Sequence, residues 1–206
     1  MKVEALSIPD VKLITPSIFK DERGFFSETF NVQILASVGI SETFVQDNHS
    51  LSAPRGVVRG LHFQVPPHEQ AKLVRVVRGA ILDVAVDIRH GSPTFGKHVA
   101  NVLSASNWSQ LWVPRGFAHG FCTLEPNTEV IYKVTDYYAP ACDRGLRWDD
   151  PGLAIAWPVS PDEVILSPKD RTHPTLAESP VQFRMRERPA QRDGAGAAGS
   201  SRQGEL

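Results

Sequence analysis

His62 is the first residue whose type and setting suggest chemistry, and it lies in the segment 59–64, which reads Arg-Gly-Leu-His-Phe-Gln. An imidazole titrates near neutral pH and can therefore act as a general base. In a strand, His62 and Gln64 point the same way, and Gly60 removes a side chain from that face, which we expect to leave room for a ligand. A lone histidine in a strand is more often a hydrogen-bonded core residue, so the other residues near His62 decide between the two interpretations.

Lys72 and Tyr132 are predicted to point into an apolar interior. Strand alternation places each of them on one face with valines at the neighbouring alternate positions. An unpaired buried ammonium is costly, which makes Lys72 a reasoned candidate for a functional site. A turn of the form Pro-x-Gly-x-x-His at 114–119 delivers a second histidine, His119. The presence of Lys72, Tyr132 and His119 favours the interpretation of His62 as a functional residue over that of a core histidine.

Short apolar runs with turn residues between them predict the elements that must position these side chains. A helical repeat predicts one short helix at 31–38, which ends at Gly39. From residue 43 onward the periodicity changes to two, and seven or more short strands indicate an all-β sandwich or barrel. The expected strands are 57–63, 72–78, 81–88, 98–103, 110–113, 117–124 and 128–138.

In the segment 81–88, the even positions from Leu82 to Ile88 form an apolar face, which we expect to point inward. Asp83 and Asp87 fall on the opposite face. The segment 128–138 places Tyr138 on the same face as Tyr132, where it could stack on a nucleotide base or pack at the rim of a site.

Composition and charge limit the class of protein. With 206 residues, 41% of them hydrophobic, the chain can form one globular domain, which we place at 1–183. The Gly-, Ala- and Ser-rich segment 184–206 is expected to be disordered. A net charge of −1 gives no basic field for nucleic acid or an anionic membrane, and no stretch is long and apolar enough to span a bilayer. We therefore expect a cytoplasmic protein, with Cys122 and Cys142 as free thiols.

The Pro-x-Gly-x-x-His turn resembles the second motif of the cupin superfamily, whose first motif places two histidines and a glutamate around a metal. Here the first motif reads His62-Phe63-Gln64, so Gln64 stands where a histidine ligand would be. Glu69 lies near the expected glutamate position, but Gly79 is out of register. Glutamine is a poor ligand for transition metals, so we expect no catalytic metal and no cofactor.

Eight motifs narrow the resemblance to one cupin family, the dTDP-4-dehydrorhamnose 3,5-epimerases, over residues 1–183. The resemblance implies a cupin-type double-stranded β-helix (a jelly-roll barrel) with a few short helices. It also implies a homodimer that inverts C3 and C5 of dTDP-4-keto-6-deoxy-D-glucose to give dTDP-4-keto-L-rhamnose, in dTDP-L-rhamnose biosynthesis. The motifs are Asp21-x-Arg23-Gly24-x-Phe26-x-Glu28, Gln46-Asp47-Asn48-His49-Ser50, Arg59-Gly60-Leu61-His62-Phe63-Gln64, Lys72-Leu73-Val74, Val113-Pro114-x-Gly116-Phe117-Ala118-His119-Gly120-Phe121, Tyr132-x-x-x-x-Tyr137-Tyr138, Trp148-x-Asp150-Pro151 and Leu166-Ser167-Pro168-Lys169-Asp170.

The resemblance implies catalytic roles that suit the chemistry of these side chains. A proton on a carbon next to a ketone needs a base, the enolate oxygen needs a cation or donor, and inversion needs a donor on the opposite face. The implied base is His62, the enolate partner Lys72 and the donor Tyr132. Asp170 is implied to bond the far nitrogen of His62 and so fix its tautomer.

The resemblance also implies a set of residues that bind the substrate. Arg59, Lys169 and His119 are expected at the diphosphate or the sugar, and arginine suits phosphate because its planar donors can bond two oxygens at once. The segment with Arg23, Phe26 and Glu28 is expected to reach across from a partner subunit; without the resemblance, Arg23 and Glu28 would be a surface ion pair. The remaining expected substrate-binding residues are Gln46, Asn48, Tyr138 and Asp143.

Three alternatives stay open at this point. Epimerisation at C3 or C5 alone would use the same base and enolate partner. A metal-dependent cupin oxygenase or isomerase would use His62, His119 and Glu69. A non-catalytic sugar-binding cupin would be supported by the loss of a catalytic residue, but His62, Lys72, Tyr132 and Asp170 are all present.

Overall fold

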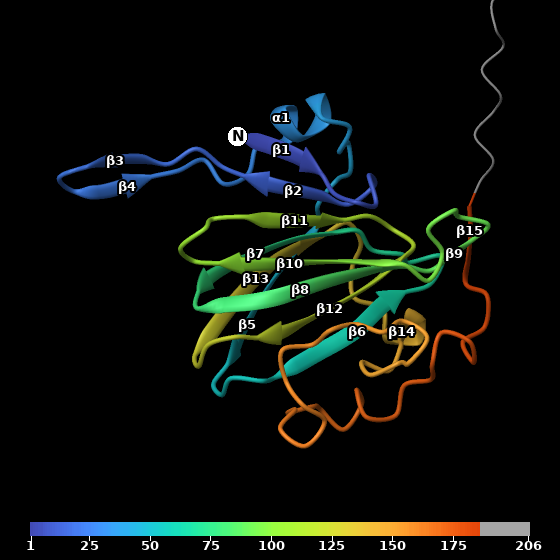
Figure 1. The fold of residues 1–206 in the computed structure, drawn as a ribbon. Coiled ribbons are helices and arrows are strands. Elements are labelled where there is room, and N and C mark those ends of the chain that lie inside the picture. The colour runs from blue at the N-terminus through green and yellow to red at the C-terminus, as the bar shows by residue number, and fades with distance from the viewer. Residues whose placement is uncertain (186–206) are drawn as a thin grey trace, which may run out of the picture.

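The computed structural model describes residues 1–185 and consists mainly of antiparallel strands, which confirms the all-β prediction (Figure 1). One sheet has six strands in the order β1 (Lys2–Ala5), β2 (Lys12–Thr15), β11 (Gln110–Val113), β7 (Lys72–Arg78), β13 (Thr128–Val134) and β5 (Gln46–Ser52). The other has five, in the order β10 (His98–Ser104), β8 (Ala80–Asp87), β12 (Phe117–Thr123), β6 (Val58–Gln64) and β14 (Asp143–Gly145).

The two sheets face each other across one buried apolar core. Val74 and Val130 enter it from the six-stranded sheet, and Leu103, Phe117 and Phe121 enter it from the five-stranded sheet. Burial of each such side chain stabilises the fold by about 1.5–3 kcal/mol. The core fixes the separation of the sheets and therefore the spacing of the polar side chains that they present to each other.

The structure corrects the predicted orientation of the strand at 81–88. β8 is buried on both faces: Ile81 and Ala85 pack in the core between the sheets, whereas Val84 and Val86 pack outside, against residues 146–185, here called the C-terminal segment. The predicted inward face therefore points out of the core between the sheets. Asp83 lies on the inward face and is fully buried. Alternation identified the more apolar face, but it could not show that a second layer of chain covers that face.

The predicted helix is present as α1 (Val32–Ser37), within one residue of the expected bounds at each end. Asn31 caps its N-terminus, because the side-chain oxygen accepts from the backbone N–H groups of Gln33 and Ile34. Gly39 follows the C-terminus with a φ of 83°, the left-handed conformation that glycine adopts without strain.

The predicted strand at 128–138 is too long. β13 ends at Val134, and the Asp136 side chain accepts a hydrogen bond of 2.7 Å from the backbone N–H of Tyr137, a local turn that stops the ladder. The alternation of β13 therefore does not continue to Tyr138, and the expectation that Tyr138 shares a face with Tyr132 is wrong. The chain continues as a short 3₁₀ turn, Pro140–Cys142.

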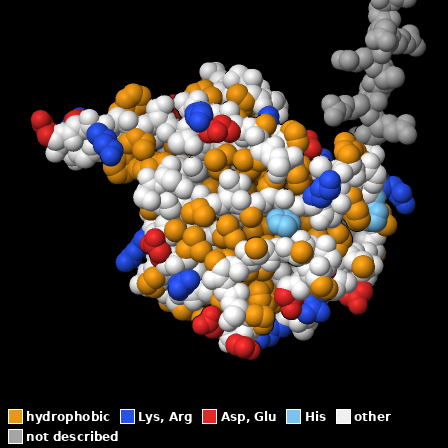
Figure 2. Space-filling model, viewed as in Figure 1, with side chains coloured by type: hydrophobic (Ala, Val, Ile, Leu, Met, Phe, Trp, Pro, Cys, Tyr) orange, Lys and Arg blue, Asp and Glu red, His pale blue; other side chains and the backbone are white. Residues whose placement is uncertain are grey.

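Several short elements have no counterpart among the predicted strands. β3 (Phe19–Asp21) and β4 (Gly24–Phe26) form a hairpin that projects away from the body of the molecule (Figure 1). Phe19, Phe25 and Phe26 are each more than 60% exposed on this hairpin. Figure 2 shows hydrophobic side chains on the hairpin and across the face of the body beside it. The hairpin thus carries apolar surface that this single chain does not cover.

The C-terminal segment runs over the outside of the five-stranded sheet (Figure 1). It ends with β15 (Phe183–Arg184), which pairs in parallel with β9 (Arg89–His90). Arg184, the first residue of the predicted disordered tail, therefore lies in a strand, and residues 186–206 lie outside the described part of the chain. Within residues 1–185, no helix has the length and apolar character needed to cross a membrane.

Candidate active site

A cavity of about 490 Å³ opens between the two sheets and contains most of the predicted site residues. His62 and His119 enter it from β6 and β12 of one sheet, whereas Lys72 and Tyr132 enter it from β7 and β13 of the other. Asp170 closes one side from the C-terminal segment. The four strand residues therefore line one space from opposite walls, as the alternation predicted for Lys72 and Tyr132.

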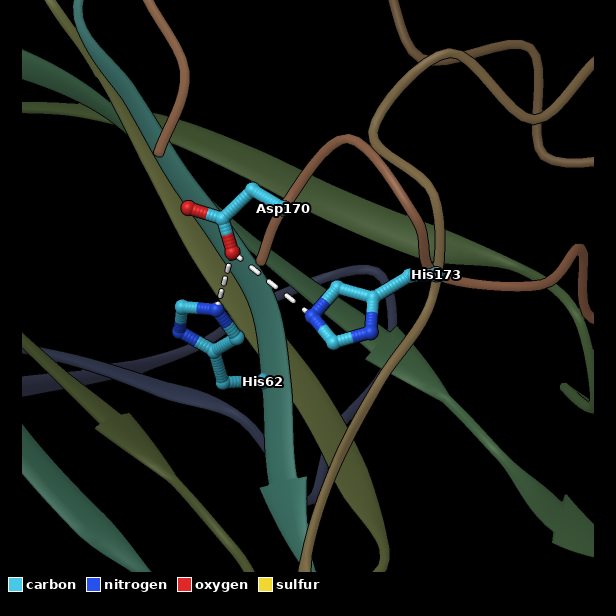
Figure 3. Close-up of side chains that lie close together, drawn as sticks. All are labelled: His62, Asp170 and His173. Atoms are coloured by element: carbon cyan, nitrogen blue, oxygen red, sulfur yellow. Dashed lines mark hydrogen bonds and ion pairs between the residues drawn. The ribbon is translucent and has the colours of Figure 1, made fainter. Parts of the chain in front are cut away.

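His62 is bonded to a buried carboxylate. Its Nε2 lies 2.5 Å from Oδ1 of Asp170, which is only 3% exposed (Figure 3). Ser167 fixes the carboxylate further, since its hydroxyl donates to Oδ2 of Asp170 at 2.9 Å. A carboxylate at Nε2 holds the imidazole proton on that nitrogen and leaves the lone pair on Nδ1. The pairing joins residues 108 positions apart in the sequence.

Burial dominates the basicity of His62. It lowers the pKa of the imidazole below the ordinary histidine value; Asp170 acts in the opposite direction, and Lys72 and Lys169 lower the pKa further. His62 is therefore neutral at pH 7 and able to accept a proton. Burial would also raise the pKa of the Asp170 carboxyl, but the neighbouring His173 ring and the hydrogen bonds with His62 and Ser167 outweigh it and hold that pKa well below its usual range.

Lys72 is a buried cation that has no carboxylate in hydrogen-bond contact among residues 1–185. It is 8% exposed, and its ammonium donates to the backbone carbonyl of His62 at 3.3 Å. Burial lowers the pKa of Lys72 from 10.5 to about 8, against the opposing charges of Asp143 and Asp83. The ammonium therefore stays charged at pH 7 in a site of low polarity, where it can stabilise a developing negative charge most effectively.

Tyr132 lies partly buried against the core, with its ring in contact with the apolar cluster between the sheets. Burial raises the pKa of its hydroxyl above 10; Arg59 lowers it and Asp143 raises it. The phenol therefore keeps its proton at neutral pH. Its position on β13 places it on the wall of the cavity that faces β6 and His62.

His119 lies deeper than expected of a residue that binds substrate. It is 6% exposed, and its Nε2 lies 2.6 Å from Oδ1 of the fully buried Asp83. The sequence analysis missed Asp83, because the apolar alternation of its strand pointed the other face inward. The His119–Asp83 pair adds a second histidine–carboxylate contact to the wall of the cavity.

The site has two openings: the cavity of about 490 Å³ and a second, smaller pocket of about 200 Å³. His62, Lys72 and Tyr132 line both, and polar residues surround each of them. Arg59 lies at one opening and donates to Ser52 Oγ and to the carbonyl of Leu51, both at 3.1 Å. The second opening is lined in part by Gln46, Asn48, Tyr138, Asp143 and Lys169.

Hydrogen bonds join the polar residues of the second opening. Gln46 donates to Asn48 at 2.9 Å, and Asp143 accepts from Tyr138 at 3.0 Å and from Lys169. The structure therefore brings Arg59 and Lys169 to the cavity, and Gln46, Asn48, Tyr138 and Asp143 to the second opening beside it.

Arg23, Phe26 and Glu28 do not reach the cavity of their own chain. Arg23 pairs with Asp21 on the projecting hairpin, Phe26 is 69% exposed, and Glu28 accepts from Asn31. None of the three lines either opening. If these residues contact substrate, they must do so in another subunit.

The structure does not assemble the metal set that cupin motifs suggest. Gln64 donates to the carbonyls of His68 and Tyr137 and accepts from the N–H of Ala139, so it serves the backbone of a loop. Glu69 pairs with Arg115 at 4.0 Å and does not line the cavity. His62, His119 and Glu69 therefore do not fit a shared metal ion. Within residues 1–185, the one group close enough to share an ion is His62, Asp170 and His173.

Gly60 is required for strand packing rather than for ligand space. A Cβ at Gly60 would lie 2.6 Å from the Cα of Gly120 and 2.8 Å from the carbonyl oxygen of His119. A Cβ at Gly120 would lie 2.8 Å from the carbonyl oxygen of Arg59. The strands β6 and β12 thus approach backbone to backbone, and the expectation that Gly60 leaves room for a ligand is wrong.

His173 was not among the predicted site residues. Its Nε2 lies 3.6 Å from Oδ1 of Asp170, the oxygen that also contacts His62 (Figure 3). The only signal in the sequence is a spacing of three residues from Asp170, which is common in turns and carries no chemistry by itself.

Comparisons with known proteins identify the family that this chain resembles. Residues 5–178 match the family model described as dTDP-4-dehydrorhamnose 3,5-epimerase. A dTDP-4-dehydrorhamnose 3,5-epimerase of Sinorhizobium fredii is 54% identical over 183 residues, which cover 89% of this chain and 93% of the relative.

Solved structures extend the similarity to the fold. The Bacillus anthracis 3,5-epimerase with TDP and PPi bound has a TM-score of 0.82 at 52% identity, over 84% of this chain and 98% of its own. The Legionella pneumophila dTDP-6-deoxy-D-glucose-3,5-epimerase, in complex with dTDP-4-keto-L-rhamnose, has a TM-score of 0.86 at 45% identity, over 90% and 98%. These neighbours identify the two facing sheets as the expected cupin-type fold.

Proposed function

Because the chain belongs to the dTDP-4-dehydrorhamnose 3,5-epimerase family, we propose that it inverts C3 and C5 of dTDP-4-keto-6-deoxy-D-glucose in dTDP-L-rhamnose biosynthesis. The observation that carries the proposal is the opposition of His62 and Tyr132 across one cavity, each on a different sheet. Inversion at carbon requires a base on one face of the sugar and a proton donor on the other. A flat sugar ring between the sheets would meet both.

The first step is removal of the proton next to the C4 ketone by Nδ1 of His62. Its neutrality at pH 7 and the Asp170 contact at Nε2 support this role, since both leave the lone pair on Nδ1. The electron pair of the C–H bond moves toward the ketone, and negative charge develops on the C4 oxygen. The buried Lys72 ammonium is placed to stabilise that oxygen. Tyr132 then gives its proton to the carbon from the opposite face and inverts it.

Basic and polar residues at the cavity suit the nucleotide diphosphate. Arg59 and Lys169 supply positive charge near the openings, as a pyrophosphate requires. Gln46, Asn48, Tyr138 and Asp143 supply hydrogen-bonding groups beside them. The bound TDP and PPi of the Bacillus anthracis neighbour support a nucleotide substrate for this chain.

The projecting hairpin supports a homodimer. Phe19, Phe25 and Phe26 expose apolar surface that one chain leaves uncovered, and a second copy can bury it. Such a partner would bring Arg23, Phe26 and Glu28 to a neighbouring cavity, as the sequence analysis expected. The cytoplasmic location is also a proposal, supported by the two cysteines Cys122 and Cys142, which are free thiols.

Hydrogen exchange tests the function directly. The enzyme is incubated with dTDP-4-keto-6-deoxy-D-glucose in heavy water, and deuterium at C3 and C5 is followed by NMR together with product stereochemistry. We expect deuterium at both carbons and the L-rhamno product. If neither carbon exchanges its proton, epimerase activity on this substrate is refuted. Exchange at C3 without C5 would select the single-site alternative.

A further inference from the structure

His173 is a second imidazole at the Asp170 carboxylate, and the proposed mechanism gives it no role. It comes from the C-terminal segment three residues after Asp170, whereas His62 comes from β6. Both Nε2 atoms approach the same oxygen, at 3.6 Å for His173 and 2.5 Å for His62 (Figure 3). The two rings are 5.7 Å apart and nearly perpendicular. The carboxylate therefore lies between two histidines.

The ring nitrogen of His173 is buried without a hydrogen bond. The side chain is only 10% exposed, and among residues 1–185 its Nε2 has no partner within hydrogen-bonding distance. Leaving such a group unsatisfied is costly, because it loses its hydrogen bonds to water and gains none from the protein. Oδ1 of Asp170 lies 3.6 Å from this nitrogen, and a movement of about half an ångström would make the bond. The geometry thus directs the His173 donor to the carboxylate that orients His62.

Gly145 provides the space that holds His173 there. A Cβ at Gly145 would lie 2.4 Å from Nε2 of His173 and 2.5 Å from its Cδ2. Gly145 lies in β14 directly opposite His62, and its φ is outside the left-handed region, so glycine is needed here for space alone. The absent side chain of Gly145 leaves a gap, filled by the His173 ring, next to the strand position of His62.

Two donors on one carboxylate oxygen divide its negative charge. Asp170 favours the protonated form of His62, and a second N–H on the same oxygen weakens that preference. The other titratable and charged groups around His62 come from four strands and the C-terminal segment, and a change at His173 does not alter them. They are Lys72 on β7, His119 on β12, Tyr132 on β13, Asp143 on β14 and Lys169 in the C-terminal segment.

We propose that His173 is a positioning residue for the reaction, which fixes the Asp170 carboxylate and shares its Oδ1 with His62, so that His62 stays unprotonated at neutral pH. The proposal rests on the proposed epimerase function. It predicts that loss of the His173 donor strengthens the hold of Asp170 on the protonated form of His62. The acidic limb of the pH profile should then move to higher pH.

The test compares the pH dependence of kcat/KM for wild-type enzyme and His173→Phe. Phenylalanine keeps a ring beside Gly145 but removes the donor. We expect kcat/KM to fall about tenfold at pH 6 and much less at pH 8, below the ~100-fold that a 1 Å misplacement of a reacting group can cost. An NMR titration of the His62 imidazole should show the same upward displacement.

Three further variants separate positioning from packing. His173→Gln keeps an N–H near the position of Nε2 and should restore the wild-type acidic limb. Gly145→Ala leaves the donor in the chain but displaces the ring, and should move the limb as His173→Phe does. His68→Phe is the matched control, because His68 also lies beside an aspartate, Asp136 at 3.3 Å, but lines neither opening. It should leave the profile unchanged.

The outcomes distinguish this inference from the proposed function. If wild-type enzyme turns over but His173→Phe loses the same factor at every pH, or if His173→Gln does not restore the limb, His173 serves only packing and the inference is wrong. If wild-type enzyme exchanges no deuterium, the proposed function fails first. The NMR titration of His62 then still tests the shared carboxylate.

Discussion

Replacement of Lys72 by methionine should stabilise the fold while it removes most of the activity. Methionine has a similar length and no charge, so the cavity wall stays filled. The difference between a pKa of 10.5 and about 8 means that the fold disfavours the charged ammonium by roughly 3 kcal/mol. Lys72→Met removes this cost, and the free energy of unfolding at pH 7 should rise by up to about 3 kcal/mol.

The size of this stabilisation depends on pH in a defined way. Between about pH 8 and 10.5 the unfolded chain binds a proton at Lys72 that the folded chain has released, so wild-type stability rises with pH across this window. The advantage of Lys72→Met is therefore complete below about pH 8 and vanishes above 10.5. In a chain of this size, 1 kcal/mol corresponds to about 2–4 °C in Tm, so the variant should melt several degrees higher at pH 7.

Activity should change in the opposite direction. Loss of the group that stabilises the enolate should lower kcat by about 10²–10³. Calorimetry at pH 7 and pH 10.5 and the deuterium-exchange assay measure the two effects, with the exposed Lys97→Met as the control, which should alter neither by much. A lower Tm for Lys72→Met at pH 7 would refute the cost of the buried ammonium. Full activity would refute its role at the enolate.

Four further outcomes follow from the same site. Because the reaction needs neutral His62 and charged Lys72, kcat/KM should fall at low pH with an apparent pKa below the ordinary histidine value, and at high pH with one near 8; a basic limb at 10 or above would contradict the Lys72 assignment. Asp170→Asn replaces one acceptor oxygen by an NH₂ donor and removes the negative charge beside His62 Nε2; steady-state kinetics should show a kcat lower by about 10³–10⁴, and Tm should change little. Tyr132→Phe should retain deuterium exchange at the carbon that faces His62 but lower net inversion by about 10²-fold or more; equal loss of both would assign Tyr132 to binding instead. Treatment with a chelator should leave kcat unchanged, whereas loss that added iron, manganese or nickel restores would favour the metal-dependent alternative.

Local alternation predicted the parts of the site that lie on regular strands. Lys72 lies on β7 with Val74 and Val76, and Tyr132 lies on β13 with Val130; these valines face the core between the sheets, so a period of two was enough to place both side chains in the interior. His62 was identified on β6 from its type and its neighbours, because the space expected at Gly60 does not exist. The helix at 31–38 was also predictable, because its cap and its terminal glycine are both local signals.

Other features depend on contacts that no local pattern contains. β8 is buried on both faces, and only the path of the C-terminal segment decides which one lies outside, so Asp83 was placed wrongly. The contact of Asp170 with His62 spans 108 positions and came from family resemblance. His173 reaches the carboxylate only because β14 has a glycine opposite His62, a condition that involves three separate segments.

The backbone contact between Gly60 and Gly120 links mutational tolerance to catalysis at a distance from any reacting atom. A methyl group at either position would push β6 away from β12, and these strands carry His62 and His119. In a saturation mutagenesis scored by epimerase activity, both glycines should therefore reject every substitution as strictly as the histidines do. Sensitivity to substitution would then identify strand spacing, and not only chemistry, as the property under selection.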